Sequence, residues 1–479
     1  MNNSFSNTLE SPSPATVNKL EDFIIKLFQK SPNQKYGVVS LPIAAVDPLS
    51  YLKKCWDKDG FQYYWEKPSD EFAIAAGEKM LTVSASGKDR FRQVNRQIKA
   101  VQKATSECSF AAHSYSGLMF LGGFSFFDTI STAAWKPFKA ASFTVPKWMI
   151  IKDGSSHLLT ISFDLKSFPS PKKLHRHLLQ KIEEIKQFIV ITPVNKMNGR
   201  KEVGPSENHL LPNQGLEYGH WISSIKKAKY RINQNTFKKI VLARHISRTD
   251  VETSPIQIIS RLRRQYSDCH NFLIHHPDNS TFLGSTPERL ASFRHNLLQT
   301  EALAGSIQRG ETSAEDAMFE QDLTVSSKEQ HEHNFVVKDI QQRLKPFVDH
   351  FDMNHQPGVR KLANVQHLYT PIRANLNKNA DILSVIEQLH PTPAVGGFPR
   401  KDAVPYIKEL ENFERGWYAS PIGWLNTKGR GEFGVAIRSG LLTKSTAHFY
   451  AGCGIVADSD PHAEWKETHL KFQPMLSAL

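Results

Sequence analysis

Residues 235–244 read Asn235-Thr-Phe-Lys-Lys239-Ile-Val-Leu-Ala-Arg244, and the interpretation of the whole chain starts from this run. Its unbroken apolar residues are typical of a buried strand, with Lys239 fixed at the entrance. A lysine at a strand edge is usually a surface residue whose ammonium reaches water. The functional alternative is a general base, which needs the lowered pKa that partial burial can supply.

A second apolar run, Thr281–Gly284, meets a turn rich in Gly and Pro, and Glu288 follows that turn. Glutamate is common at the start of a helix, so a purely structural role is one interpretation. In a cleft, burial would raise the pKa of Glu288 and suit it to a general acid. Further along, Glu301–Gly305 places small residues beside a strand end, where either a ligand approaches the backbone or the chain turns tightly.

Residues 326–337 have a helical pattern that contains His331-Glu332-His333. Two histidines suggest zinc, but adjacent helical positions point in different directions and cannot easily share one metal. The HExxH spacing of zinc proteases is also absent from this run. A single carboxylate, Glu332, facing a site is therefore favoured, and carboxylates without imidazole suit Mg²⁺.

Near the C-terminus, Glu464, Glu467 and Lys471 follow the spacing i, i+3, i+7 and share one helical face. The structural interpretation is a solvated face stabilised by a Glu467–Lys471 pair. The functional one directs two carboxylates at a metal and an ammonium at a substrate carboxylate. Upstream, Arg438 ends the apolar run that begins at Gly434, and an arginine in that place suits bidentate carboxylate binding.

Length and composition set outer limits. The chain has 479 residues, 40% of them apolar and 22% charged, which is typical of a soluble protein with one large or two ordinary domains. Its apolar stretches are strand-sized and fall short of the roughly 20 residues of a membrane span. The four cysteines are far apart and form no CxxC pair, which argues against a disulfide framework or structural zinc and favours a reducing cytoplasm.

The net charge of +13 has two interpretations, a nucleic-acid binder or an enzyme for an anionic metabolite. The basic residues are scattered in short pairs, with no dense block and no nucleic-acid motif. A dispersed, solvated basic surface is therefore favoured, without a nucleic-acid or membrane partner.

Along the chain, residues 1–16 are rich in Ser, Asn and Pro and are expected to be a disordered tail. A helix is expected over Lys19–Lys30, and the polar residues 196–214 are the best linker candidate. Helix and strand patterns mix without regular alternation, which predicts an α+β fold with much antiparallel sheet.

Taken together, these segments resemble the chorismate-utilising enzymes, and their order and spacing agree with that family. The segments are Lys239–Arg244, Gly284–Arg289, Glu301–Gly305, His331–His333, Leu389–Pro399, Ala436–Arg438, Ala451–Val456 and Glu464–Glu467. The resemblance implies one large fold with two packed, largely antiparallel sheets flanked by helices. Residues 17–214 would form its N-terminal half, and residues 215–479 its chorismate-binding catalytic region.

Differences within the family point to one activity. Ammonia-using members resemble this chain but have glutamine where Lys239 stands, and aminodeoxychorismate synthases have lysine where Ala304 stands. Anthranilate synthases read His-Pro-Thr-Gly-Thr where this chain reads His390-Pro-Thr-Pro-Ala394. The resemblance therefore implies water as the nucleophile and an isochorismate synthase, an isomerase that needs no glutaminase subunit.

The resemblance also implies roles for individual residues. Lys239 would activate water for attack on C2 of chorismate, and Glu288 would protonate the departing C4 hydroxyl. Mg²⁺ would be held by Glu332, Glu464 and Glu467. The substrate-binding residues would be Ala304, Gly305, His390, Thr392, Arg438, Gly452 and Lys471.

Two alternatives stay open at this point. A salicylate synthase shares the hydration step and then eliminates pyruvate from isochorismate in the same site. A catalytically inactive basic binding protein on the same fold is the alternative from another class. The enzyme would be a monomer or homodimer whose product feeds menaquinone or siderophore biosynthesis.

Overall fold

The computed structural model describes residues 14–29, 34–57, 59–191, 215–354, 356–361, 365–378, 380–444 and 446–479. The linker predicted at 196–214 and residues 1–13 of the predicted tail lie outside these ranges. Residues 19–29 of the helix predicted over Lys19–Lys30 are helical in α1, and Lys30 lies outside the described residues. Helix α1 already begins at Pro14, so residues 14–16 of the predicted tail are helical. None of the helices in the described ranges is long and apolar enough to cross a membrane.

The helices of the described residues have the following bounds: α1 Pro14–Gln29, α2 Pro48–Lys54, α3 Arg90–Lys103, α4 Pro171–Ile191, α5 Gly215–Asn233, α6 Pro255–Gln265, α7 Ser313–Val325, α8 Ser327–Leu344, α9 Ile382–Leu389, α10 Arg400–Leu410 and α11 Pro461–Leu476. The strands are β1 Tyr36–Pro42, β2 Gln62–Lys67, β3 Phe72–Ala85, β4 Thr105–Ser109, β5 Met119–Phe124, β6 Ala141–Asp153, β7 Ser156–Asp164, β8 Lys239–Thr249, β9 His270–His276, β10 Ser280–Thr286, β11 Arg289–Arg294, β12 Leu297–Gln308, β13 Val348–Met353, β14 Gly358–Lys361, β15 Val365–Leu376, β16 Gly397–Phe398, β17 Pro421–Asn426, β18 Arg430–Val435, β19 Ser439–Leu442 and β20 Thr446–Ile455.

The described strands form one hydrogen-bonded network, in which only the β1–β4 pairing is parallel. Its centre is the long pair β3–β6, whose register shifts between Lys79 and Leu81. Before that shift β3 also pairs with β2, and beyond it β6 pairs with β5. One arm continues from β2 through β9, β10, β19, β20 and β8, and the other from β5 through β17, β18, β11, β12 and β15.

The two arms face each other across the core. Tyr63 Oη in β2 donates a 3.0 Å hydrogen bond to the Gly423 carbonyl in β17, although these strands are not neighbours in the network. The rings of Phe72 and Trp424 also meet, with centroids 5.6 Å apart. The two packed sheets expected from the resemblance are therefore present as layers, but β3 and β6 join them because each long strand serves both.

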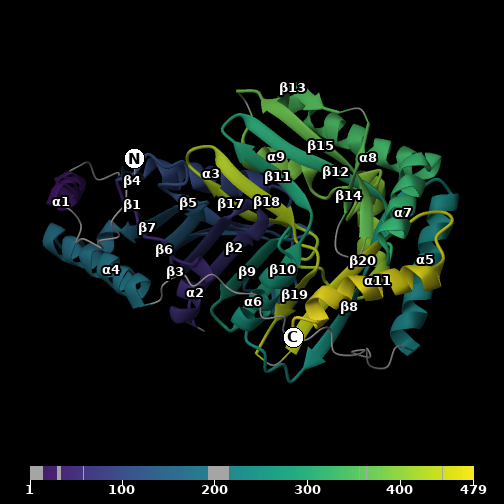
Figure 1. The fold of residues 1–479 in the computed structure, drawn as a ribbon, viewed down its shortest axis with the longest axis horizontal. Coiled ribbons are helices and arrows are strands. Elements are labelled where there is room, and N and C mark those ends of the chain that lie inside the picture. The colour runs from purple at the N-terminus through teal and green to yellow at the C-terminus, as the bar shows by residue number, and fades with distance from the viewer. Residues whose placement is uncertain are drawn as a thin grey trace.

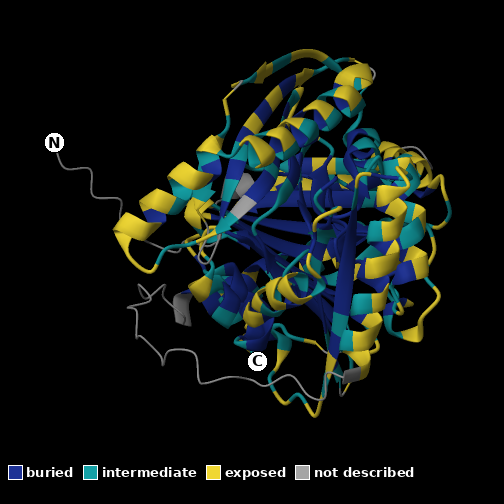
Figure 2. Ribbon diagram, turned by 90° about the vertical axis from the view of Figure 1, so that its right-hand side faces the viewer, coloured by how far each residue is buried: buried dark blue, intermediate teal, exposed yellow. Residues whose placement is uncertain are grey.

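The strands have buried residues on both faces of the sheet. In β2, Tyr63 and Trp65 belong to the core between the layers, while Tyr64 belongs to a second core on the outer face. The same alternation places Phe272 inside and Leu273 outside. Helices cover the outer faces, with α1 and α4 at one end and α5, α7, α8 and α11 at the other (Figure 1). Figure 2 shows the resulting dark blue sheet interior under helices whose outward residues are exposed.

Strands from the two parts of the chain pair directly with each other. Strand β2 pairs with β9, and β5 pairs with β17, so strands from residues 36–164 and from residues 239–455 share one network. This pairing brings strand β8, the turn after β10, strand β20 and helices α8 and α11 around one cavity.

Candidate active site

The candidate active site is a cavity of about 340 Å³ between the sheet and helices α8 and α11. It collects residues from most of the C-terminal half of the chain. Its lining includes Lys239, Glu288, Ala304, Gly305, Glu329, Glu332, His367, Arg415, Tyr418, Arg438, Gly452, Gly454, Glu464, Glu467 and Lys471. Ten of the twelve residues predicted for the site are in this lining: Lys239, Glu288, Ala304, Gly305, Glu332, Arg438, Gly452, Glu464, Glu467 and Lys471.

Lys239 enters the cavity from the first residue of β8. Its side chain is 18% exposed, and its Nζ donates a 2.5 Å hydrogen bond to Glu332 Oε1 on α8. Gly454 in the neighbouring strand β20 leaves room for it, because a Cβ there would lie 2.6 Å from Lys239 Cε. The lysine is thus held in the cavity and is not a snorkelling surface side chain.

Glu288 lies at the turn between β10 and β11, where its backbone N–H donates to Thr286 Oγ1 at 3.2 Å. Thr392 Oγ1 donates to Glu288 Oε1 at 3.4 Å. Burial, and then the nearby charge of Glu301, raise the pKa of Glu288 to about 7. A carboxyl group of this kind is protonated in about half of the molecules at pH 7, and in that form it can donate a proton to a leaving group.

Two helices direct carboxylates into the cavity. Helix α11 begins at the Asp460 N-cap, and its face presents Glu464 and Glu467, while α8 presents Glu332. Burial, and then the charge of Glu467, raise the pKa of Glu464 above its usual range. Such crowding of buried carboxylates is relieved when a cation lies between them.

The donor set fits Mg²⁺ in its chemistry, because hard carboxylate oxygens from two helices face one cavity. In the described ranges, however, no three His, Cys, Asp or Glu side chains already converge on one metal position. Glu332 is paired with Lys239, and Glu467 is paired with Lys471 at 2.5 Å. Burial alone would raise the pKa of Glu467, but Lys471 holds it below its usual value.

The histidines beside Glu332 do not join it. His333 is 1% exposed, and its ring nitrogens lie 3.3 Å from the Ala304 carbonyl and 2.7 Å from Thr370 Oγ1. His331 packs its ring against Phe335. The prediction that Glu332 faces the site without imidazole partners agrees with this arrangement.

Two cations are available for an anionic ligand. Arg438 has a positive φ of 51°, and its Nη1 is buried without a hydrogen-bond partner among the described residues. Burial lowers the pKa of Arg438, as expected for a cation removed from water. Lys471 Nζ donates to the Gly452 carbonyl at 2.9 Å as well as to Glu467. An unpaired buried guanidinium donor is a natural partner for a substrate carboxylate.

The small residues of β12 also line the cavity. Gly305 has a φ of +75°, and the β12–β15 register shifts between Ala304 and Ser306. A Cβ on Gly305 would come 3.0 Å from a Glu329 carboxylate oxygen. This bulge leaves small residues on this part of the wall, and their contact with a ligand stays a prediction.

His390 is one of two predicted substrate-binding residues that are not part of the cavity lining. Its ring is buried, and Nε2 lies 3.2 Å from the Phe126 carbonyl. His390 thus packs against the N-terminal part of the chain, and its contact with a substrate stays a prediction. Thr392 is absent from the lining but contacts Glu288 directly.

Sequence reasoning missed several lining residues. Glu329 lies one turn before Glu332, and the i, i+3 spacing could have revealed it. His367, Arg415 and Tyr418 carry no local signal, since strand and loop pairing alone brings them there. Burial, together with Lys471 and Arg438, lowers the pKa of His367 to about 4, so this histidine is neutral at pH 7.

In chemical terms, the cavity offers an amine and a raised-pKa carboxyl group on its walls, with two cations and several carboxylates. It can therefore hold a small polyanion and exchange protons with it at two points. Proton exchange of this kind suits addition and elimination of a hydroxyl group.

Comparisons with known proteins agree with this description. The chorismate binding enzyme family model matches residues 21–479. The salicylate biosynthesis isochorismate synthase of Pseudomonas aeruginosa is 35% identical over 442 residues, covering 92% of this chain and 89% of that protein. Isochorismate synthase MenF of Bacillus subtilis is 33% identical over 451 residues, or 92% of each chain. The solved menaquinone-specific isochorismate synthase MenF of Escherichia coli superposes with a TM-score of 0.72 at 26% identity, covering 96% of this chain and 99% of that one.

Proposed function

The chain belongs to the chorismate-binding enzyme family, and from this premise we propose that it is an isochorismate synthase, an isomerase that converts chorismate to isochorismate. The observation that carries the proposal is that Lys239 and Glu288 line one cavity together with Arg438 and Lys471. Both sequence relatives described above bear the name isochorismate synthase and are matched over most of their length.

In the proposed reaction, Lys239 accepts a proton from a water molecule, which attacks C2 of the chorismate ring. The ring double bonds shift, and the C4 hydroxyl leaves as water with the proton that Glu288 donates. One water is added and one is lost, so the atoms balance as an isomerisation. Each positioned acid or base of this kind contributes on the order of 10²–10⁴-fold to the rate.

Chorismate carries two carboxylates, and the cavity has partners for both. We assign the enolpyruvyl carboxylate to Arg438, the Gly452 backbone and Lys471. Arg438 supports this assignment because its Nη1 is buried without a partner among the described residues. Ala304 and Gly305 would lie against the substrate, and Thr392 would orient Glu288.

Glu332, Glu464 and Glu467 are the residues that would hold Mg²⁺. When bound, the ion supplies electrostatic stabilisation for the ring carboxylate of the substrate. Glu332 has a second role in the proposal, because its hydrogen bond to Lys239 Nζ orients that side chain in the cavity.

Water as nucleophile follows from Lys239, so we propose that the enzyme works without a glutaminase subunit. Salicylate formation is the less favoured outcome, because the matched relatives are named as isochorismate synthases. Pyruvate distinguishes the two activities, because only a salicylate synthase releases it, together with salicylate.

The test is chorismate turnover by the full-length protein with Mg²⁺ and with EDTA, with products separated by chromatography and pyruvate measured by a coupled dehydrogenase assay. Isochorismate without pyruvate, lost with EDTA and restored by excess Mg²⁺, is the expected result. Stoichiometric pyruvate and salicylate would contradict the proposal in favour of a salicylate synthase. Absence of turnover together with salt-dependent DNA retention would favour the basic binding protein.

A further inference from the structure

A buried ion pair connects the lining of the candidate active site to that of a second cavity, of about 140 Å³, beside strand β8. Arg415 lines the first cavity, and Glu411 lines the second. Their side chains are 1% and 2% exposed. Burying two charges adds little net stability but can fix one arrangement of the chain. The reaction proposed above uses neither residue, so a role in fixing the site is open to them.

The guanidinium of Arg415 contacts two segments that are far apart in the chain. Nη1 donates to the Val395 carbonyl at 2.9 Å, in the loop before β16. Nη2 donates to the Val241 carbonyl at 2.8 Å, in strand β8. Nε and Nη2 also donate to the Glu411 carboxylate, and the guanidinium carbon lies 4.3 Å from the centre of the Phe126 ring. All three nitrogens of this side chain therefore already have acceptors in the protein.

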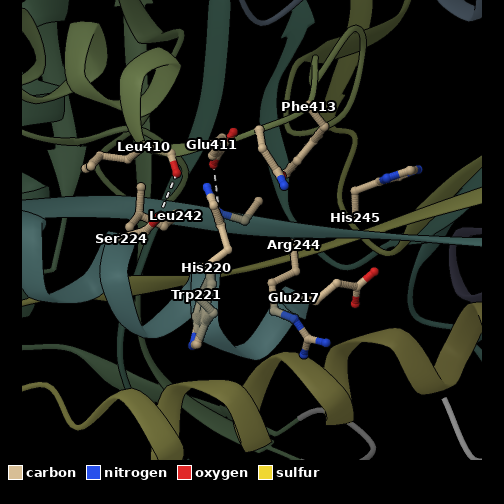
Figure 3. Close-up of a pocket in the computed structure, with 12 residues that line it drawn as sticks. Glu217, His220, Trp221, Ser224, Leu242, Arg244, His245, Leu410, Glu411 and Phe413 are labelled. Atoms are coloured by element: carbon tan, nitrogen blue, oxygen red, sulfur yellow. Dashed lines mark hydrogen bonds between the residues drawn. The ribbon is translucent and has the colours of Figure 1, made fainter. Parts of the chain in front are cut away.

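Glu411 is held by groups on both sides of it. Its Oε1 accepts a 2.7 Å hydrogen bond from the Ala243 N–H, so the ion pair contacts β8 at two positions. Ser224 Oγ on α5 donates to the Leu410 carbonyl at 2.8 Å and fixes the segment that carries Glu411. Figure 3 shows these two hydrogen bonds as dashed lines. The ion pair is thus anchored to a strand and, through this segment, to a helix.

The strand contact of Arg415 leads to the proposed base. Lys239 is the first residue of β8, two positions before Val241. The Val241 N–H donates to the Gly396 carbonyl at 3.3 Å, and the Val241 carbonyl accepts from Arg415. The entrance of β8, from which Lys239 reaches the cavity, is therefore tied to the loop before β16 partly through Arg415.

The loop contact of Arg415 leads to the proposed acid. The N–H groups of Val395 and Gly396 donate to the Thr392 carbonyl at 3.2 and 2.9 Å, which closes a turn. Arg415 holds this turn at the Val395 carbonyl. Thr392 Oγ1 donates to Glu288 Oε1 at 3.4 Å. The turn therefore places one donor on the carboxyl group that is proposed to give up its proton.

We propose that Arg415, held by Glu411, is a positioning residue that keeps Lys239 and the Thr392 partner of Glu288 at a fixed separation. The proposal rests on the proposed function for the roles of Lys239 and Glu288. A misplacement of about 1 Å can lower the rate of an enzyme about 10²-fold, so a small displacement of either segment should matter.

The first measurement is the titration of Glu288 in the full-length protein, by NMR of ¹³C-labelled glutamate carboxyl groups. The Glu288 signal is assigned as the one that Glu288→Gln removes. Arg415→Lys keeps the charge, but one ammonium cannot replace a planar fork that joins two carbonyls and a carboxylate. The Thr392 donor favours the charged form of Glu288, so losing it should move the titration to higher pH.

A double-variant cycle tests whether Arg415 acts through Thr392. Thr392→Val removes the donor directly and should also move the Glu288 titration to higher pH. Adding Arg415→Lys to Thr392→Val should then change the titration little, because both substitutions break one contact. Full additivity of the two shifts would show that Arg415 does not act through Thr392, and would overturn the proposal.

Glu411→Gln is the second variant. The charged groups that face Glu288 are Glu301 on β12, Lys471 on α11 and Lys239 on β8, and this variant leaves all three in place. Removing a negative charge can only move the titration of Glu288 to lower pH. A move to higher pH in Glu411→Gln would therefore report the weakened Thr392 contact.

Turnover of chorismate gives an independent readout. In Arg415→Lys, kcat should fall about 10- to 100-fold while KM stays unchanged, because the groups assigned to the substrate carboxylates are untouched. Arg263→Lys is the matched control. Arg263 pairs with the buried Glu66 at 2.7 Å and lies outside the cavity lining, so this variant should change neither kcat nor the Glu288 titration.

The outcomes separate this proposal from the proposed function. A raised KM with an unmoved Glu288 titration would make Arg415 a substrate ligand and overturn the positioning role. A titration that stays in place or moves to lower pH in Arg415→Lys would overturn it as well, and Glu411→Gln decides by the same criterion if that variant does not fold. Wild-type protein without chorismate turnover would contradict the proposed function alone, since the titration needs no turnover.

Discussion

At the scale of single residues, the two proton-transfer groups carry the proposed chemistry in different ways. Lys239 depends on its position, because the Glu332 contact and the space above Gly454 fix its side-chain nitrogen in the cavity. Glu288 depends on its surroundings, because burial and Glu301 raise its pKa to about 7, so that a large fraction of it stays protonated near neutral pH. Substitutions of Lys239 and Glu288 can therefore test separately where the base lies and whether the acid is protonated.

Replacing the base tests the assignment of Lys239. Lys239→Gln should lower the rate of isochorismate formation by 10² or more, the order expected for one acid–base group, and high ammonia could then permit slow amination. Lys238→Gln is the matched control, because that exposed neighbour has its Nζ over the Phe335 ring and outside the cavity. Wild-type turnover in Lys239→Gln would refute the role of the base.

Replacing the acid should be as damaging. Glu288→Gln cannot donate a proton to the C4 hydroxyl, so turnover should fall by a similar 10² or more. Chorismate binding should persist, because the proposed carboxylate partners, Arg438 and Lys471, are untouched. Steady-state kinetics and a chorismate titration of the variant measure the two effects separately. A variant with normal kcat would show that another group protonates the leaving hydroxyl.

The pH dependence follows from the pKa of about 7 for Glu288. The acid is active when protonated, so its contribution to kcat/KM should be lost as pH rises through about 7. Glu301→Gln removes the charge that helps to raise this pKa, and should move the descending limb of the profile to lower pH. The measurement is kcat/KM between pH 5 and 9 for both proteins. An unmoved limb would mean that Glu288 does not set it.

At the scale of elements, helix α11 fixes the geometry of two carboxylates and one ammonium. Its N-cap, Asp460, accepts hydrogen bonds from the backbone N–H of His462 at 3.1 Å and Ala463 at 2.8 Å. The cap holds the first turn, from which Glu464 projects. Arg244 holds the middle of the helix through Trp465 and Thr468.

Asp460→Ala tests whether this helix end positions the proposed metal carboxylates. Loss of an N-cap costs about 1 kcal/mol of stability, so urea unfolding should shift by that order. We also expect the Mg²⁺ concentration for half-maximal turnover to rise. Asp381→Ala, which removes the N-cap of α9 outside the cavity, is the control for a simple loss of stability. A rise of equal size in both variants would exclude a positioning role for α11.

At the scale of the whole molecule, the N-terminal and C-terminal parts complete each other's sheet. The 14-residue strand β3 belongs to both layers, and strands β9 and β17 have their partners β2 and β5 in the N-terminal part. Removing residues 1–214 would strip those partners and expose core aromatics such as Phe272 and Trp424.

A fragment of residues 215–479 should therefore be insoluble or unfolded, although it contains all the predicted site residues. The full chain should unfold in one cooperative transition, because a shared core couples the two parts. Calorimetry of the full chain and solubility of the fragment measure this. A soluble fragment with chorismate turnover would show that residues 215–479 are an independent domain.

Local patterns were sufficient for much of the candidate site. The i, i+3, i+7 spacing of Glu464, Glu467 and Lys471 places them on one helical face, and the structure finds all three in one cavity. Glu288 after its turn and Lys239 at its strand entrance followed from the same kind of reasoning. These features depend on a few neighbouring residues, whose backbone geometry the sequence itself dictates.

Features that depend on contacts across the chain were decided by tertiary structure. The Lys239–Glu332 contact spans 93 positions, and the packing of His390 against Phe126 spans 264. His367 and Arg415 reach the cavity, and Arg244 is left with unmet donors, because of strand pairing and loop packing far along the chain. The joining of two layers through β3 and β6 is of the same kind.

The sequence by itself thus determined the fold class and the chemical groups of the candidate site, because periodicity and turn chemistry act over a few residues. Only the tertiary structure decided which groups meet, how each is buried, and that β8 borders two cavities instead of one. The physical reason is that burial and nearby charges arise when distant segments pack together. These two effects set the pKa values and decide which hydrogen-bond donors are left without a partner.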